Sequence, residues 1–173
     1  DDGKWYYFGG SGAMDIGWVS DGGVWYYTGS DGVMRTGWLE ENGRRYYLND
    51  SGAMAWGWTK PDGSWYYMDS SVAMQTGWIN DGGVWYYTGS DGVMRTGWLE
   101  EGGSHYYLRG DGSMATGWRE MDGAWYYFDG SGKCVVNSWA QITGDGYLFG
   151  PDGQMMAGRA KVDSGDPDLD RGG

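Results

Sequence analysis

A repeat of twenty residues is the feature that most constrains the fold of this chain. Aromatic triplets of the Trp-Tyr-Tyr type begin at Trp5, Trp25, Arg45, Trp65, Trp85, His105 and Trp125. A Gly-Trp pair recurs at a fixed phase, with its indole at Trp18, Trp38, Trp58, Trp78, Trp98 and Trp118. A period in this range is typical of solenoids, in which each short unit buries its apolar face against its neighbours. The sequence therefore predicts a row of repeated surfaces and no single catalytic pocket.

Each repeat predicts two short strands joined by a tight turn. The first strand is expected over residues 36–40, and the second over Val24–Thr28, which is rich in β-forming residues. Between them stand dipeptides such as Asn42-Gly43, a strong hairpin signal because Gly accepts a positive φ. The loop after each hairpin ends in a glycine, except at Val72, where we expect a remodelled loop because a β-branched residue resists positive φ. A methionine such as Met34 follows the loop, and we expect it to fill the core between neighbouring hairpins.

The sequence thus predicts an all-β fold, a β-solenoid of about seven stacked hairpins. We assign the solenoid to residues 1–160 and a polar, disordered tail to residues 161–173. Residues 21–41 and 81–101 are identical, an offset of three repeats. Either about three hairpins per turn or a recent duplication of a three-repeat block would explain this identity. The last triplet decays to Gly146-Tyr147-Leu148, as expected of a capping unit.

Composition and charge exclude several classes of function. The formal net charge of −12 argues against nucleic acid as a partner and against docking on an anionic membrane. No apolar run is long enough for a membrane span or a signal peptide, so any signal peptide would lie outside this chain. One cysteine, Cys134, and one histidine, His105, cannot alone build a zinc site, a disulfide or a Cys-His pair. No catalytic set stands out, so we expect no enzyme activity, no metal and no cofactor in this chain.

The aromatic residues of one hairpin face predict a binding site for a quaternary ammonium ion. Along the second strand, Trp25 and Tyr27 point the same way, while Tyr26 points to the other face and is assigned to the core. Trp18 lies across the turn from Trp25, and a tyrosine of the next hairpin would add a third aromatic wall. A quaternary ammonium ion donates no hydrogen bond but is drawn to π faces, by at most ~2 kcal/mol per contact. Single sites would therefore bind choline weakly, whereas several sites facing one polymer would gain avidity.

The repeat resembles the choline-binding repeats of pneumococcal-type surface proteins and phage lysins. The segment from Gly77 to Tyr87, continued by Met94-Arg95-Thr96-Gly97-Trp98, carries the pattern, and the resemblance covers about residues 3–158. It implies a left-handed superhelix of hairpins that binds choline, as phosphocholine of (lipo)teichoic acid. It also implies a secreted protein held on the bacterial cell wall. We expect this chain to be part of a longer protein, and a homodimer is compatible with the sequence.

The resemblance also implies which residues form the sites, with the third wall assigned here to the last tyrosine of the next triplet. Three complete sites result: Trp18, Trp25 and Tyr47; Trp58, Trp65 and Tyr87; and Trp78, Trp85 and Tyr107. Three weaker or incomplete sites are Trp38 with Tyr67, Trp98 with Tyr127, and Trp118 with Trp125. Arg45 and His105 replace the second indole in the first two, and Leu148 replaces the tyrosine of the third. We expect the positive charge of Arg45 to abolish binding at its site.

Two other functions remain open at the level of sequence. Repeats that bind α-glucan are the main alternative because sugars also stack on aromatic rings, although that class usually lacks the paired tryptophans and the regular spacing. A structural spacer or dimerisation rod is the third interpretation, and it predicts aromatic faces too shallow to admit a ligand.

Overall fold

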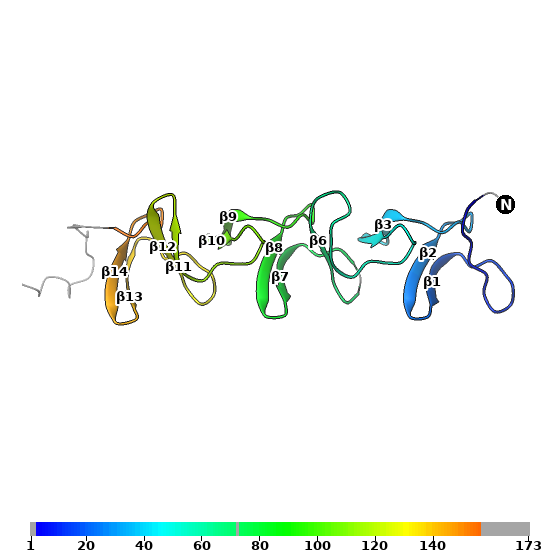
Figure 1. Ribbon diagram of the computed structural model, residues 1–173, viewed down its shortest axis with the longest axis horizontal. Coiled ribbons are helices and arrows are strands. Elements are labelled where there is room, and N and C mark those ends of the chain that lie inside the picture. Colours follow the sequence, from blue (N-terminus) through cyan, green and yellow to red (C-terminus); the bar gives the residue numbers. More distant parts are fainter. Residues whose placement is uncertain (1–2, 72, 157–173) are drawn as a thin grey trace, which may run out of the picture. The chain divides into compact units, whose positions relative to one another are not determined.

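The computed structural model describes residues 3–71 and 73–156 and shows an all-β fold (Figure 1). Within these residues the chain forms fourteen strands and no helix. The strands pair in sequence order into seven two-stranded sheets, so each repeat is a separate hairpin. The predicted all-β fold of seven hairpins is therefore confirmed.

The strands lie close to their predicted positions. They are β1 (Gly17–Asp21), β2 (Val24–Thr28), β3 (Gly37–Glu41), β4 (Arg44–Leu48), β5 (Gly57–Thr59), β6 (Tyr66–Met68), β7 (Gly77–Asp81), β8 (Val84–Thr88), β9 (Gly97–Glu101), β10 (Ser104–Leu108), β11 (Gly117–Met121), β12 (Ala124–Phe128), β13 (Ser138–Ile142) and β14 (Asp145–Phe149). The second strand predicted over Val24–Thr28 is β2, and the first strand predicted over residues 36–40 begins one residue later as β3.

The chain divides into two compact units. The first contains Asp1–Gly97 and Leu108–Met114, and the second contains Trp98–Tyr107 and Ala115–Gly173. The first unit therefore holds the hairpins from β1 to β8, and the second holds β11 to β14 with most of β9 and β10. Val72 and the predicted tail lie outside the described residues. The handedness and the number of hairpins per turn stay predictions.

Tight turns close the hairpins, and one hairpin departs from the rest. In the β3–β4 turn, Asn42 and Gly43 have φ values of 53° and 72°, which matches the two-residue turn that suits a twisted ribbon. The β5–β6 ladder ends at the pair of Thr59 with Tyr66, so its strands are three residues long. Pro61 explains the loss, because it occupies the place of a strand residue but has no N–H to donate to the ladder.

The methionines after the loops join consecutive hairpins. The Met54 N–H donates to the carbonyl of Trp25 at 2.8 Å, which connects the segment after β4 to the start of β2. The same bond joins Met34 to Trp5, Met74 to Arg45, Met94 to Trp65, Met114 to Trp85, Cys134 to His105 and Met155 to Trp125. The Met34 side chain also packs against Gly52, which has a φ of 79° and where an added Cβ would displace the end of the Met34 side chain. The predicted role of the methionines as fillers between hairpins is confirmed.

The ends of the row differ from the prediction. The triplet at Trp5 takes part in isolated bridges, such as Tyr6 with Val33, and belongs to no named strand. The decayed triplet, by contrast, lies in β14 and pairs over five residues with β13. Thr143 and Gly144 both have positive φ and form a turn like the others. The hairpin survives the loss of its aromatic residues because the ladder is made by backbone groups.

Candidate cation-binding sites

The hairpin register places both tryptophans of a repeat on one face. Trp18 is paired with Tyr27 across β1 and β2. Ser20, two residues along the same strand, is paired with Trp25. Since opposed residues share a face and alternate residues return to it, Trp18, Trp25 and Tyr27 lie together. Tyr26 lies on the other face, as the alternation predicted.

The last tyrosine of each triplet contacts the Gly-Trp indole of its own hairpin. The ring centroids of Trp18 and Tyr27 are 5.1 Å apart, with an interplanar angle of 73°. The same edge-on contact joins Trp38 to Tyr47, Trp58 to Tyr67, Trp78 to Tyr87, Trp98 to Tyr107 and Trp118 to Tyr127, at 5.0 to 5.5 Å. These last tyrosines were predicted to reach the previous hairpin, and the structure places each of them against the indole of its own hairpin.

The middle tyrosine of the next triplet is the residue that reaches the previous hairpin. The centroid of Tyr46 lies 4.8 Å from that of Trp18 at 66°. Equivalent contacts join Trp38 to Tyr66, Trp58 to Tyr86 and Trp98 to Tyr126, at 4.8 to 5.1 Å. Within each unit, the tryptophan face of one hairpin therefore meets the opposite face of the next, which carries the middle tyrosine. The prediction assigned this tyrosine to the core alone, and the structure also places its ring against the Gly-Trp indole of the previous hairpin.

The site in the second unit that was predicted to be incomplete has three walls. The centroids of Trp118 and Trp125 are 6.2 Å apart, and Tyr147 lies 4.7 Å from Trp118. The prediction looked for the third ring at Leu148. The ring that contacts Trp118 comes from the middle position of the triplet, where the decayed triplet keeps Tyr147.

Within the first unit, a middle tyrosine contacts one indole of each of two predicted tryptophan pairs. Tyr46 contacts Trp18 of the pair with Trp25, and Tyr86 contacts Trp58 of the pair with Trp65. Trp78 and Trp85 form another pair, with centroids 6.4 Å apart. Tyr107, the predicted partner of that pair, belongs to the second unit, so this predicted site is divided between the units and stays a prediction.

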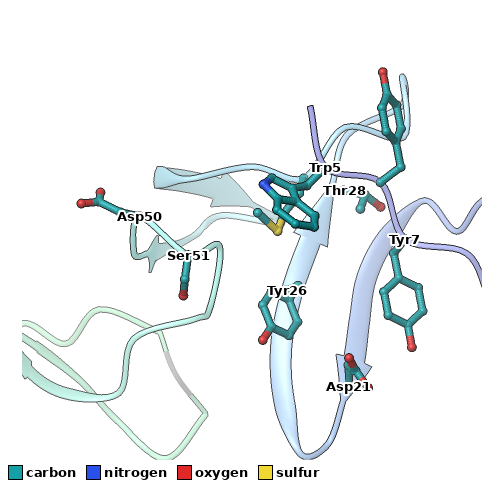
Figure 2. A pocket seen from close by; sticks show the side chains of 9 residues that line it. Trp5, Tyr7, Asp21, Tyr26, Thr28, Asp50 and Ser51 are labelled. Carbon is teal, nitrogen blue, oxygen red and sulfur yellow. The ribbon is translucent and has the colours of Figure 1, made fainter. Parts of the chain in front are cut away.

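A cavity of about 400 Å³ shows how such a face is lined. It surrounds Trp5 and includes Tyr26 from β2, Met34 from the following loop and Asp21 from the end of β1. Figure 2 shows the Trp5 and Tyr26 rings with the Asp21 and Tyr7 side chains to one side of them. The triplet tryptophan, the middle tyrosine, a methionine and a carboxylate thus share one cavity. Sequence reasoning missed the methionine and the carboxylate as lining residues.

The triplet tryptophans are too exposed to be explained as core residues. Trp25, Trp65 and Trp125 keep 46%, 40% and 42% of their surface exposed, whereas Phe128 and Leu48 are completely buried. The indoles therefore offer ring surface to a ligand while their other edges pack on the hairpin.

Two cations of the chain itself lie over these walls. The Arg45 guanidinium carbon is 4.5 Å from the Trp38 ring centroid, and the Lys60 ammonium is 5.6 Å from that of Trp65. Both distances fall within the range of a cation–π interaction. Arg45 was predicted to place its charge where a ligand would sit, and it lies over the Gly-Trp indole of its site.

The described residues form neither a metal site nor a membrane-spanning helix. Among residues 3–71 and 73–156, no group of three His, Cys, Asp or Glu side chains could hold a metal ion. Within the same part of the chain, no helix is long and apolar enough to cross a bilayer. Cys134 is buried in the place of a methionine, and burial, followed by the charge of Asp152, raises the pKa of its thiol to about 11.

Comparisons with known proteins identify the family of these repeats. A family model described as a choline-binding repeat matches residues 16–56, 35–74, 75–114 and 95–139, and a model of a cell wall binding repeat matches residues 1–14. No curated protein matches the chain.

Three solved structures from Streptococcus pneumoniae illustrate the similarity. Choline binding protein F is 39% identical with a TM-score of 0.81, over 91% of this chain and 56% of that one. CbpJ of strain TIGR4 is 37% identical with a TM-score of 0.81, over 87% and 56%. The modular autolysin LytC is 30% identical with a TM-score of 0.63, over 90% and 37%. This chain thus spans about half the length of CbpJ and choline binding protein F. With family matches along most of its length, the chain belongs to the family of choline-binding repeat proteins.

Proposed function

We propose that this chain is a non-catalytic module that binds choline groups on the bacterial surface. Its ligand would lie between a pair of tryptophans of one hairpin and the middle tyrosine of the next. Trp18, Trp25 and Tyr46 would form one such site, and Trp118, Trp125 and Tyr147 another. The same arrangement at Trp58 supports a third site.

The observation that carries the proposal is the position of the internal cations. The guanidinium of Arg45 and the ammonium of Lys60 lie over indole rings of these faces. A positive group is therefore stable at this place in the fold, as the negative potential of an aromatic face requires. A trimethylammonium group offers the same charge, has a larger apolar surface and needs no hydrogen-bond acceptor.

The polymer that presents the choline is proposed to be (lipo)teichoic acid, which would hold an attached protein on the cell wall. Several weak sites on one chain gain affinity together when a polymer offers repeated choline groups. Choline binding protein F has also been solved in the presence of a peptidoglycan analogue, which supports a setting at the cell wall for relatives of this chain.

Affinity chromatography tests this proposal. The chain should be retained on a trimethylammonium or choline resin at high salt, and free choline should elute it. Replacing Trp25, Trp65 and Trp125 together by Ala should abolish retention. Replacing the exposed Trp139, whose hairpin of β13 and β14 carries no second tryptophan, should leave it unchanged. Retention on dextran with no retention on the choline resin would favour the α-glucan alternative and contradict the proposal.

A further inference from the structure

A carboxylate lies beside the aromatic rings of the cavity around Trp5. Asp21, the last residue of β1, lines the cavity that contains Trp5 and Tyr26 (Figure 2). The acid comes from the same hairpin as the middle tyrosine, but it serves the tryptophan of the triplet before that hairpin.

The same strand position reaches two further sites of the first unit. Asp81 ends β7, and its Oδ2 accepts a hydrogen bond from the Trp58 indole N–H at 3.2 Å. Glu41 ends β3, and its Oε2 accepts a hydrogen bond from the Tyr27 hydroxyl at 3.3 Å. Tyr27 shares its face with Trp18 and Trp25. Each acid is therefore bonded to an aromatic group of the previous hairpin.

The negative charge of these acids contributes to raised pKa values of tyrosines on the aromatic face. Burial and then the Glu41 carboxylate raise the pKa of Tyr27 above its ordinary value. Burial and then the Asp81 carboxylate raise the pKa of Tyr67, which contacts Trp58. Both hydroxyls would be harder to ionise next to a negative charge, and a cation at the same place would be stabilised.

The spacing of the acids follows the tryptophans. Asp21 follows Trp5, Glu41 follows Trp25, Asp81 follows Trp65 and Glu101 follows Trp85, in each case at the same distance along the chain. Where Arg45 or His105 replaces the triplet tryptophan, that position is Pro61 or Met121. The acid is therefore present after four of the triplet tryptophans and absent where the indole is lost.

The triplet tryptophan of the second unit lacks this acid. After Trp125 the equivalent position, at the end of β13, is the buried Ile142. Glu120 is paired with Trp125 across β11 and β12, but the equivalent Glu40 is paired with Arg45, so this carboxylate does not follow the indole.

We propose that Asp21, Glu41 and Asp81 are ligand-binding residues that restrict these aromatic sites to positively charged groups. The inference rests on the proposed choline function and adds a determinant of specificity to it. An aromatic face alone stacks on neutral as well as charged groups, whereas a carboxylate at its edge favours a cation only. At Glu41 and Asp81 the hydrogen bond to a hydroxyl or an indole fixes the carboxylate beside the face, so that little reorganisation is needed on binding.

A neutral isostere of choline tests this role directly. 3,3-Dimethyl-1-butanol replaces the charged nitrogen by carbon and keeps the shape, so the ratio of the two affinities measures the contribution of charge. Binding would be followed by NMR at the indole N–H signals of Trp25 and Trp65 in the full chain. In the double variant Glu41→Gln and Asp81→Asn, choline affinity should fall about threefold to tenfold at both sites, and affinity for the isostere should stay unchanged.

Glu40→Gln is the matched control, because it removes the same charge one residue before Glu41 and on the other face of β3. It should leave both affinities at Trp25 unchanged. A wild-type chain that does not bind choline would contradict the proposed function itself. A wild-type chain that binds choline, with a double variant that keeps its preference for choline over the isostere, would overturn the role of the acids. Equal weakening of both ligands would also overturn it, because the acids would then only position the aromatic walls.

Discussion

At the scale of single residues, the first position of each triplet sets the chemistry of the face that it occupies. An indole there leaves a half-exposed ring surface, as at Trp25. Arg45 instead places a guanidinium over Trp38, and Tyr66 still closes the other side. Two of the three walls are therefore intact where the sequence predicts no binding.

Replacing Arg45 by tryptophan should open this site. The change Arg45→Trp removes the internal cation and restores the missing wall, so the chain should bind one further equivalent of choline. The new site should be weaker than the others because Pro61 stands where they have an acid. Titration calorimetry with a choline polymer or free choline gives the stoichiometry. Arg44→Trp, on the other face of β4, should add no site, and an unchanged stoichiometry in Arg45→Trp would refute the prediction.

Removing Lys60 should strengthen an existing site. Its ammonium lies over Trp65 and competes with a bound cation. An exposed cation–π contact is worth ~0.5–1 kcal/mol, so Lys60→Ser should raise choline affinity at Trp65 about twofold to fivefold. The measurement is the shift of the Trp65 indole signal during a choline titration. Lys60→Arg keeps the charge and should show no gain, and equal gains in both variants would count against competition.

The buried thiol predicts a dependence of stability on alkaline pH. The folded-state pKa of Cys134, about 11, lies above its ordinary value of 9.0, so the folded state holds the proton more tightly. This contribution is fully present below pH 9 and is lost as the pH rises to about 11. Urea unfolding of the wild type and Cys134→Met should therefore diverge in this range, with the wild type losing more. Parallel curves across the range would show that the thiol does not titrate in this way.

At the scale of the element, the sequence predicted the hairpins well because turn chemistry and strand composition are local. Asn42-Gly43 marks its turn directly, and β2 has its predicted bounds. The alternation of Trp25, Tyr26 and Tyr27 also gave the correct faces. It did not say which face of one hairpin meets the next, since that depends on contacts between repeats.

For the same reason, the sequence did not indicate which tyrosine of a triplet contacts the previous hairpin. Tyr47 contacts Trp38 of its own hairpin, and Tyr46 contacts Trp18 of the previous hairpin. The cross-strand pair of Trp38 with Tyr47, read from the hairpin register, would have indicated this. The shortened β5 was also predictable from Pro61, whose missing N–H ends the ladder.

The contact between a methionine and a loop glycine predicts the energetics of a repeat. Gly52 has a φ of 79°, and a Cβ there would collide with the Met34 sulfur. Gly52→Ala should therefore lower the free energy of unfolding by about 2–4 kcal/mol, from backbone strain and overpacking together. Gly110→Ala is the control, since a Cβ there meets nothing within 4 Å, and it should change stability by less than about 0.5 kcal/mol. Similar losses in both, measured by urea unfolding, would contradict this account of the loop.

At the scale of the whole molecule, ligand binding and stability should be coupled. Each site takes walls from two hairpins, as Trp18 and Tyr46 show, so choline should bind the folded chain only. A ligand at ten times its dissociation constant adds about 1.4 kcal/mol per filled site. The melting temperature should therefore rise with choline concentration and should rise less in the chain lacking Trp25 and Trp65. Sodium chloride at equal ionic strength is the control, and an equal rise with both salts would argue against specific binding.

The bond from each methionine to an earlier triplet has a consequence for how such a chain grows and folds. Met54 reaches back to Trp25, about thirty residues, and the equivalent bonds of both units have the same short span. Contacts of this kind keep the contact order low, so loop closure costs little at each step and assembly can begin at any repeat. A block of whole repeats can then be inserted without breaking the bonds on either side of it. The identical segments 21–41 and 81–101 are what such an insertion would leave behind, and each inserted hairpin that keeps both tryptophans would bring a proposed binding site with it.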